Sequence, residues 1–295
     1  MGTREARWVL LATVLGSGVA FLDGTVVNVA LPAIAEDLDA GLDDLQWVLN
    51  AYLVTLSALV LLGGSLGDRY GRKRAFLAGL YLFTAASVLC GLAPGVTVLI
   101  AARALQGVGA ALLVPGSLAI ISASFDQEDQ ARAVGAWSGL GGIAIAIGPF
   151  VGGWLIDSVS WRLAFFINLP MAVAVVVASR HVPETSSAGS ERLDLGGALT
   201  ASVGLALATY GLIERSPVAG AAGVAALGVF LLLEARTAAP MLPLAIFRSR
   251  QFSGANGTTL AVYAALGGAF FLLVLELQVV LGYSALEAGS ALLPV

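Results

Sequence analysis

Charged residues are scarce in this sequence, since Asp, Glu, Lys and Arg make up only 12% of its 295 residues. A soluble globular protein carries about 25% charged and about 45–50% apolar residues. Here 58% of the chain is hydrophobic and the mean hydropathy is +0.92. This composition excludes a soluble enzyme and a disordered tail. The net charge of −4, with no basic region, excludes a nucleic-acid binder, and we expect no nucleic-acid partner.

Cysteine and histidine are scarcer still, with one of each, Cys90 and His181. A single cysteine cannot form a disulfide framework, and a thiolate metal site needs several. We therefore expect no metal site. The remaining class is an all-α polytopic membrane protein.

Long apolar stretches fill most of the chain. A bilayer core of about 30 Å requires about 20 apolar residues in a helix. We identify nine such stretches, and a tenth is expected to begin near Ser290. The nine predicted spans are residues 8–31, 45–66, 75–92, 96–121, 133–156, 163–179, 195–213, 218–233 and 254–281.

The 15 basic residues predict the orientation of these spans, because cytoplasmic loops are enriched in Lys and Arg. With the N-terminus in the cytoplasm, the outside loops hold only Arg162 and Arg215, and Arg103 lies within a span. The other twelve all fall inside: Arg4, Arg7, Arg69, Arg72, Lys73, Arg74, Arg132, Arg180, Arg192, Arg236, Arg248 and Arg250. One Lys against fourteen Arg also suggests a GC-rich bacterial genome, so we expect a multi-pass protein of the bacterial inner (plasma) membrane.

The loop after the second span reads GSLGDRYGRKR at residues 64–74. Glycines permit a tight turn between two helices, and a carboxylate at a helix end can pair with an arginine. The segment resembles the G-x-L-a-D-r-x-G-r-k signature of the major facilitator superfamily, in which this loop acts as a latch that holds one conformation closed to the cytoplasm. A basic loop that only sets orientation is the alternative. On the resemblance we expect the latch to comprise Gly64, Asp68, Arg69, Gly71, Arg72 and Lys73.

A carboxylate lies inside the first span, within LDGTVVNVALP at residues 22–32. Acidic residues at membrane depth are costly and are usually functional, which makes Asp23 a candidate for reversible proton binding. The segment resembles a signature of the fourteen-span drug:proton antiporter branch of the same superfamily. A structural aspartate, capped by amides or held in a fixed ion pair, is the alternative.

The fourth span contains an arginine, within LIAARALQGVGA at residues 99–110. Arg103, Gln106, Gly107 and Ala110 share one helical face by their spacing, and the buried guanidinium must find a partner. The pattern resembles a signature of proton-coupled antiporters, which implies a role for Arg103 in proton coupling. A static interhelical ion pair is the alternative.

Asp23 and Arg103 are expected to lie at similar depths in the membrane. At 1.5 Å per residue Asp23 lies about 22 Å from the inner end of its span, and Arg103 lies about 20 Å from the inner face. We hypothesise that the two side chains interact directly or through water, and that protonation of Asp23 loosens their contact.

The fifth span contains GGIAIAIGPFVGG at residues 141–153. It resembles the G-x-x-x-G-P-x-x-G-G antiporter motif of exporters, with Ala144 in place of the first glycine. A proline bends a membrane helix, and small residues give a smooth packing surface. A generic packing face is the alternative. The expected motif residues are Gly148, Pro149, Gly152 and Gly153.

Four further polar residues lie within spans and are candidates to line a cavity for substrate or a cation: Asn28, Asn50, Gln106 and Glu276. Glu276 is near the outer end of the ninth span, so it could equally extend to the outer interface.

The resemblance covers nearly the whole chain and implies the helical bundle of the major facilitator superfamily, with no enzymatic activity and no cofactor other than the proton as coupling ion. We expect the following organisation: a six-span N-terminal bundle at residues 1–180, a cytoplasmic linker at 181–194, two additional central spans at 195–235, a second cytoplasmic connection at 236–253, and the start of an incomplete C-terminal bundle at 254–295.

The function implied is a monomeric, proton-coupled antiporter in the lipid bilayer that exports lipophilic or cationic drug-like compounds by alternating access. A proton-coupled importer of a small nutrient with the same fold is one alternative, and a non-transporting receptor or inactive fragment is another. Nine spans and a stub predict roughly the first two-thirds of a longer transporter, so the chain alone is expected to lack complete alternating access.

Overall fold

The computed structural model describes residues 4–186, 194–237, 240 and 242–291, and no strand occurs among them. The all-α fold class is therefore confirmed. The helices are α1 (Arg4–Leu38), α2 (Leu42–Tyr70), α3 (Arg72–Gly91), α4 (Val96–Ser124), α5 (Gln127–Ser158), α6 (Leu163–Phe166), α7 (Asn168–Ser179), α8 (Leu195–Ile213), α9 (Pro217–Arg236), the 3₁₀-helix η1 (Leu244–Arg248), α10 (Arg250–Leu275), the π-helix η2 (Glu276–Val280) and α11 (Ala285–Ala291).

Eight helices in the described part of the chain are long and apolar enough to cross a membrane, and each coincides with a predicted span. The remaining predicted span, 163–179, is a shorter apolar segment that is broken between α6 and α7. Pro170 explains the break, because its ring lacks an N–H and clashes with the carbonyl four residues earlier, that of Phe166.

Polar side chains cap the N-termini of several apolar helices. The Asp194 carboxylate accepts a hydrogen bond from Gly197 N at 2.7 Å at the start of α8. Ser216 accepts from Ala219 N at the start of α9, where Pro217 takes the first helical position. Such caps satisfy backbone donors that a helix cannot pair internally.

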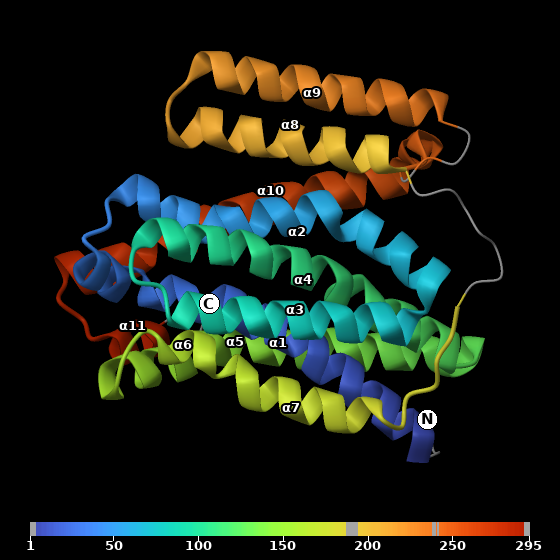
Figure 1. The fold of residues 1–295 in the computed structure, drawn as a ribbon, viewed down its shortest axis with the longest axis horizontal. Helices are drawn as coiled ribbons and strands as arrows, with labels where there is room; N and C mark the ends of the chain where they lie inside the picture. The colour runs from blue at the N-terminus through green and yellow to red at the C-terminus, as the bar shows by residue number, and fades with distance from the viewer. Residues whose placement is uncertain (1–3, 187–193, 238–239, 241, 292–295) are drawn as a thin grey trace.

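The first seven helices form one bundle, in which α4 packs on α2 and α3, and α1 packs on α5 and α7. The α8–α9 hairpin lies along one edge of this bundle and contacts α2 through α8 (Figure 1). The helix α11 packs against α5. Throughout Arg250–Leu275, which is fully described, Val274 is the one buried residue, so α10 is mostly exposed.

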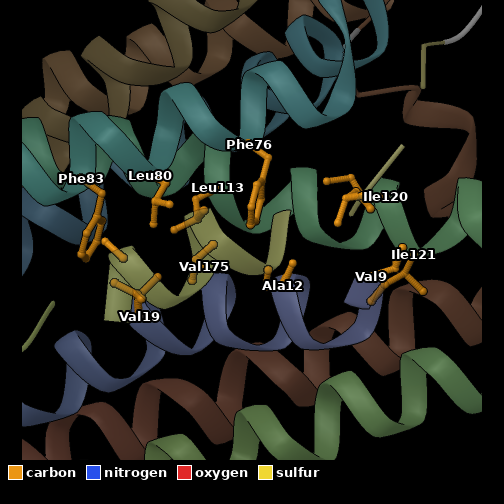
Figure 2. Packing of buried hydrophobic residues seen from close by; sticks show 14 of the residues in the cluster. Val9, Ala12, Val19, Phe76, Leu80, Phe83, Leu113, Ile120, Ile121 and Val175 are labelled. Atoms are coloured by element: carbon orange, nitrogen blue, oxygen red, sulfur yellow. The ribbon is translucent and has the colours of Figure 1, made fainter. Parts of the chain in front are cut away.

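An apolar core fills the space between α1, α3, α4 and α7, and Figure 2 shows Phe76, Leu80 and Leu113 within it. Glycines let these helices approach closely. A Cβ added at Gly109 would lie 2.5 Å from Phe83 N, and one at Gly79 would lie 2.7 Å from Gly109 O. The hydrophobic effect is weak between helices in lipid. Small residues at such crossings allow close van der Waals packing, which then drives helix association.

The start of one predicted helix changes. The helix expected near Ser290 already begins at Ala285, because Ser284 starts α11 with a cap: Ser284 Oγ accepts from Glu287 N at 3.2 Å. Of the linker predicted at 181–194, residues 187–193, including Arg192, lie outside the described residues, as do the final residues 292–295. The second connection contains the short helix η1.

Candidate functional site

Asp23 on α1 and Arg103 on α4 meet in the interior of the bundle. Arg103 Nη1 lies 2.5 Å from Asp23 Oδ2, and the two side chains are 1% and 0% exposed, respectively. The predicted contact is therefore present, and it is direct. Removing one partner of such a buried pair costs about 3–5 kcal/mol, because the other charge is left uncompensated.

Two amides complete the surroundings of the Asp23 carboxylate. Gln106 Nε2 donates to Asp23 Oδ1 at 2.7 Å, and Asn168 Nδ2 donates to the same oxygen at 2.9 Å. Together with the guanidinium of Arg103 these donors come from α4 and from the first residue of α7. All three partners are donors, so both oxygens of the carboxylate accept hydrogen bonds from neighbouring helices.

Arg103 is held by more than its ion pair. Its Nε donates to Val48 O at 3.1 Å, and its Nη1 donates to Gln106 Oε1 at 2.7 Å. The ring of Tyr52 lies 4.4 Å from the guanidinium carbon, at cation–π distance. The planar guanidinium of Arg103 is therefore held by several partners at once. The single ammonium group of a lysine could not make the same set of contacts.

A second polar layer connects this cluster to α3 and α6. Ser87 Oγ accepts a hydrogen bond from Asn168 Nδ2 at 2.8 Å and donates to Phe165 O at 2.8 Å. Neither Ser87 nor Asn168 was predicted from the sequence as a site residue. The available signal was a polar amide inside an apolar span, two residues before the proline that breaks it.

Close helix contact places α4 against α2 at this level. A Cβ at Gly107 would overlap Thr55 Oγ1 and the backbone oxygen of Tyr52. The Thr55 hydroxyl, in turn, donates to Ala104 O at 2.8 Å across the interface. The glycine that follows Gln106 thus sets the depth to which α4 enters the bundle, and with it the position of Arg103.

The predicted latch lies at the end of the bundle where α2 turns into α3. Asp68 Oδ1 accepts from Arg72 Nε at 2.8 Å and lies 2.8 Å from Arg72 Nη2, as the motif predicted for a helix-end carboxylate. Gly71 has a φ of +110°, a conformation that favours glycine, and its N–H donates to Gly67 O.

The remaining latch residues point in several directions. Gly64 faces Pro115 on α4, with an added Cβ 3.8 Å from the proline Cβ. The guanidinium of Arg69 lies 5.3 Å from the ring of Tyr70. Lys73 Nζ donates to Val182 O at 2.7 Å, so this lysine reaches the segment after α7.

That segment supplies an acidic partner that the sequence did not reveal. Glu184 Oε1 accepts from Lys73 N at 3.0 Å, and Glu184 Oε2 lies 3.8 Å from Arg74 Nε. Arg72 N also donates to Thr185 O at 2.8 Å. The loop between α2 and α3 is therefore joined to the chain that follows the sixth apolar segment.

The antiporter-motif residues of α5 face two different neighbours. An added Cβ at Gly148 would overlap Thr25 Oγ1 on α1, and one at Gly152 would lie 2.8 Å from Val26 Cγ1. Gly153 faces α11, where its Cβ would overlap Ala285 O.

The contact with α11 is reciprocal, since a Cβ at Gly289 would overlap the backbone oxygen of Pro149. The motif therefore packs α5 closely against both α1 and α11 at the end of the bundle opposite the α2–α3 loop.

The four cavity candidates do not form one site. Gln106 is buried inside the Asp23–Arg103 cluster. Asn28 Nδ2 donates to Gly24 O of its own helix, and Asn50 is half-buried on α2. Glu276 is exposed and borders an open apolar groove along α10 and η2, which does not include Asp23.

The chain resembles known transport and resistance proteins. The family described as Major Facilitator Superfamily matches residues 13–294. Multidrug resistance protein Stp of Mycobacterium tuberculosis (strain CDC 1551 / Oshkosh) is 38% identical over 97% of the chain and 55% of its own length. The Methylenomycin A resistance protein of Bacillus subtilis (strain 168) is 38% identical over 97% of the chain and 64% of its own length.

The Tetracenomycin C resistance and export protein of Streptomyces glaucescens is likewise 38% identical, over 99% of the chain and 57% of its own length. The chain thus spans between 55% and 64% of the length of these three relatives.

Solved structures support the same fold. The crystal structure of the human organic anion transporter MFSD10 (TETRAN) superimposes with a TM-score of 0.61 at 18% identity, covering 99% of this chain and 70% of that one. A bacterial homologue of the human lysosomal transporter Spinster, in an inward-facing and occupied conformation, gives 0.54 at 21% identity over 99% and 74%. At such identities the likeness concerns the fold alone.

Proposed function

The chain belongs to the Major Facilitator Superfamily and is a multi-pass membrane transporter, and on this premise we propose that it is a proton-coupled antiporter that exports lipophilic or cationic compounds. The observation that carries the proposal is Asp23, a carboxylate with no solvent exposure, paired with Arg103 in an apolar bundle. Ionisable groups at this depth are expensive, and in transporters they mark ion and proton pathways.

The proposed coupling step is the protonation of Asp23. In the ionised state the carboxylate holds Arg103, Gln106 and Asn168, and thereby ties α1 to α4 and α7. A proton removes the charge from Asp23 and weakens three charge-assisted hydrogen bonds at once. The helices are then free to change their packing, and this couples proton binding to the conformational change.

Orientation follows from the distribution of basic residues, which favours a cytoplasmic α2–α3 loop and a cytoplasmic N-terminus. In this orientation the close contact between α5 and α11 lies on the outer side. Alternating access then requires the α5–α11 contact to separate when the outer side opens. On the cytoplasmic side, the Asp68–Arg72 pair and the hydrogen bond from Lys73 N to Glu184 fix the conformation of the α2–α3 loop.

Export of drug-like compounds is supported by the relatives, whose names describe resistance to methylenomycin A, resistance to and export of tetracenomycin C, and multidrug resistance. The Gly-Pro-x-x-Gly-Gly form in α5, which resembles an exporter motif, favours export over nutrient import. Since the chain spans under two-thirds of these relatives, the transport cycle of the whole protein is part of the proposal.

The test is ethidium transport in everted vesicles from cells that express the complete open reading frame encoding this chain. We expect ethidium uptake into the vesicles when a proton gradient is imposed, and no uptake after the gradient is collapsed. Asp23→Asn should abolish gradient-driven uptake. Asp39→Asn, which removes an exposed carboxylate just after α1, should leave it unchanged.

Gradient-independent transport, or full coupling in the Asp23→Asn protein, would refute the proposal. The importer alternative predicts a different result, namely gradient-driven accumulation of a nutrient in whole cells and no ethidium movement in vesicles.

A further inference from the structure

Asn168 has an unusual environment for a buried amide. Its side chain has no solvent exposure, and both N–H groups are used, one on Asp23 Oδ1 at 2.9 Å and one on Ser87 Oγ at 2.8 Å. Its carbonyl oxygen Oδ1 is buried and accepts no hydrogen bond from any of the described residues. A buried acceptor without a hydrogen-bond donor is unfavourable, so this oxygen requires an explanation.

The surroundings of Asp23 provide that explanation. Arg103, Gln106 and Asn168 all donate to its carboxylate, so a proton placed on Asp23 finds no acceptor in this arrangement. Gln106 Oε1 already accepts from Arg103 Nη1 at 2.7 Å. The Asn168 carbonyl is the one acceptor of these amides that is unoccupied, and it needs only a half-turn of the amide to face Asp23.

We propose that Asn168 is a positioning residue that senses the protonation of Asp23 by rotating its amide, and that it passes this change to the break between α6 and α7. The inference rests on the proposed function of Asp23. In the ionised state the amide nitrogen faces Asp23. After protonation the Asp23 hydroxyl donates to Asn168 Oδ1, and the nitrogen turns away from Ser87.

Ser87 carries the change further. In the structure its hydroxyl proton is directed to Phe165 O at 2.8 Å, which anchors α6 to α3. When the Asn168 carbonyl takes the place of the nitrogen, the Ser87 hydroxyl turns toward this new acceptor and releases Phe165 O. The released carbonyl lies just before the break between α6 and α7, where Pro170 has no N–H to donate to the preceding turn.

The other titratable groups around the cluster do not offer a competing site for the proton. Asp23 comes from α1, Tyr52 from α2, Cys90 from α3 and Arg103 from α4, whereas α7 contributes the uncharged Asn168. Tyr52 and Cys90 each already direct a proton to a neighbouring acceptor, and the arginine stays charged. Asp23 is therefore the group that gains the proton.

The test measures hydrogen–deuterium exchange of residues 163–168 in the full chain, reconstituted in nanodiscs. Four proteins are compared at one pH: wild type, Asp23→Asn, Asn168→Leu and the double variant. Asp23→Asn imitates protonation, because its amide is neutral and can donate to Asn168 Oδ1. Residues 96–124 of α4 serve as an internal reference for general loosening around Arg103.

We expect Asp23→Asn to accelerate exchange at 163–168 severalfold in the wild-type background and to leave it unchanged in the Asn168→Leu background. Equal acceleration in both backgrounds, or none in the wild-type background, would overturn the inference. Ser87→Ala provides a second route, should Asn168→Leu fail to fold. Exchange at 163–168 should then be fast already, and adding Asp23→Asn should not raise it further.

Failure of the proposed function and failure of the relay through Asn168 give different experimental results. If Asp23→Asn retains gradient-driven transport, the proposed function is wrong. If transport is lost but exchange at 163–168 does not depend on Asn168 or Ser87, the proposed function stands and only the relay through these two residues is refuted.

Discussion

Asp157, in the last turn of α5, accepts hydrogen bonds from the backbone N–H groups of Ala285 at 3.1 Å and Leu286 at 2.8 Å. These two donors belong to the first turn of α11 and have no partner within that helix. One carboxylate thus joins two helices that are more than 120 residues apart in sequence, as the separations of 128 and 129 residues show. The contact lies next to the close approach of Gly153 to Ala285.

Replacement of Asp157 by alanine should loosen this contact, because two backbone donors lose their acceptor. A cysteine placed at Ala288, which is buried against α5, reports the change. We expect its maleimide labelling to accelerate severalfold in the Asp157→Ala protein. Glu128→Ala, an exposed carboxylate at the other end of α5, is the matched control. Equal labelling rates in both variants would show that Asp157 does not hold α11.

The glycine contact can be tested separately with a pair of glycines on the same helix. Gly153→Ala places a methyl group on Ala285 O, whereas Gly142 has open space around it. Overpacking of this kind costs roughly 1–3 kcal/mol. Gly153→Ala should therefore lower the thermal unfolding midpoint and reduce transport, while Gly142→Ala should leave both near wild type. Equal effects would contradict a specific α5–α11 interface.

Glu184 should protect the α2–α3 loop from proteolysis. Its hydrogen bond from Lys73 N matters more than its exposed pairing with Arg74, since surface ion pairs contribute about 0–1 kcal/mol. In Glu184→Ala, trypsin should cleave after Arg72, Lys73 or Arg74 severalfold faster than in wild type. Unchanged cleavage would mean that the loop keeps its conformation without this residue. Glu128→Ala is again a suitable control.

Arg103→Lys keeps the charge beside Asp23 but loses the fork of donors that also reaches Val48 O and Gln106 Oε1. We expect gradient-driven ethidium transport to fall at least about tenfold, equivalent to about 1.4 kcal/mol, while the protein still folds. The control is Arg162→Lys, because Arg162 pairs with Asp37 at a half-exposed site. Retained transport in Arg103→Lys would show that positive charge alone suffices.

The sequence predicted much of the fold because hydrophobic runs and glycine-rich motifs report membrane helices directly. The eight long apolar helices found among the described residues all coincide with predicted spans, and the similar depths of Asp23 and Arg103 followed from helical rise alone. The break between α6 and α7 was not predicted, because an apolar composition fits one continuous helix as well as two short ones.

The partners of the site were harder to predict, because they depend on tertiary contacts between distant segments. Nothing in the sequence distinguishes these partners from other polar residues, and only the packing of the helices gives them their roles. They are Ser87, Asn168, Glu184 and Asp157. The sequence placed Gln106 on the same helical face as Arg103, but its contact with Asp23 depends on how α1 packs against α4. The roles proposed for the latch and motif residues remain predictions.

In the proposed function, Asp23 carries the proton that drives export. The most direct measurement adds ethidium to the purified protein, made from the complete open reading frame, in a weakly buffered solution and records proton release with a pH indicator. Wild type and Asp39→Asn should release protons on ethidium binding, whereas Asp23→Asn should bind ethidium without release. Release from Asp23→Asn equal to that from wild type would show that another group carries the proton.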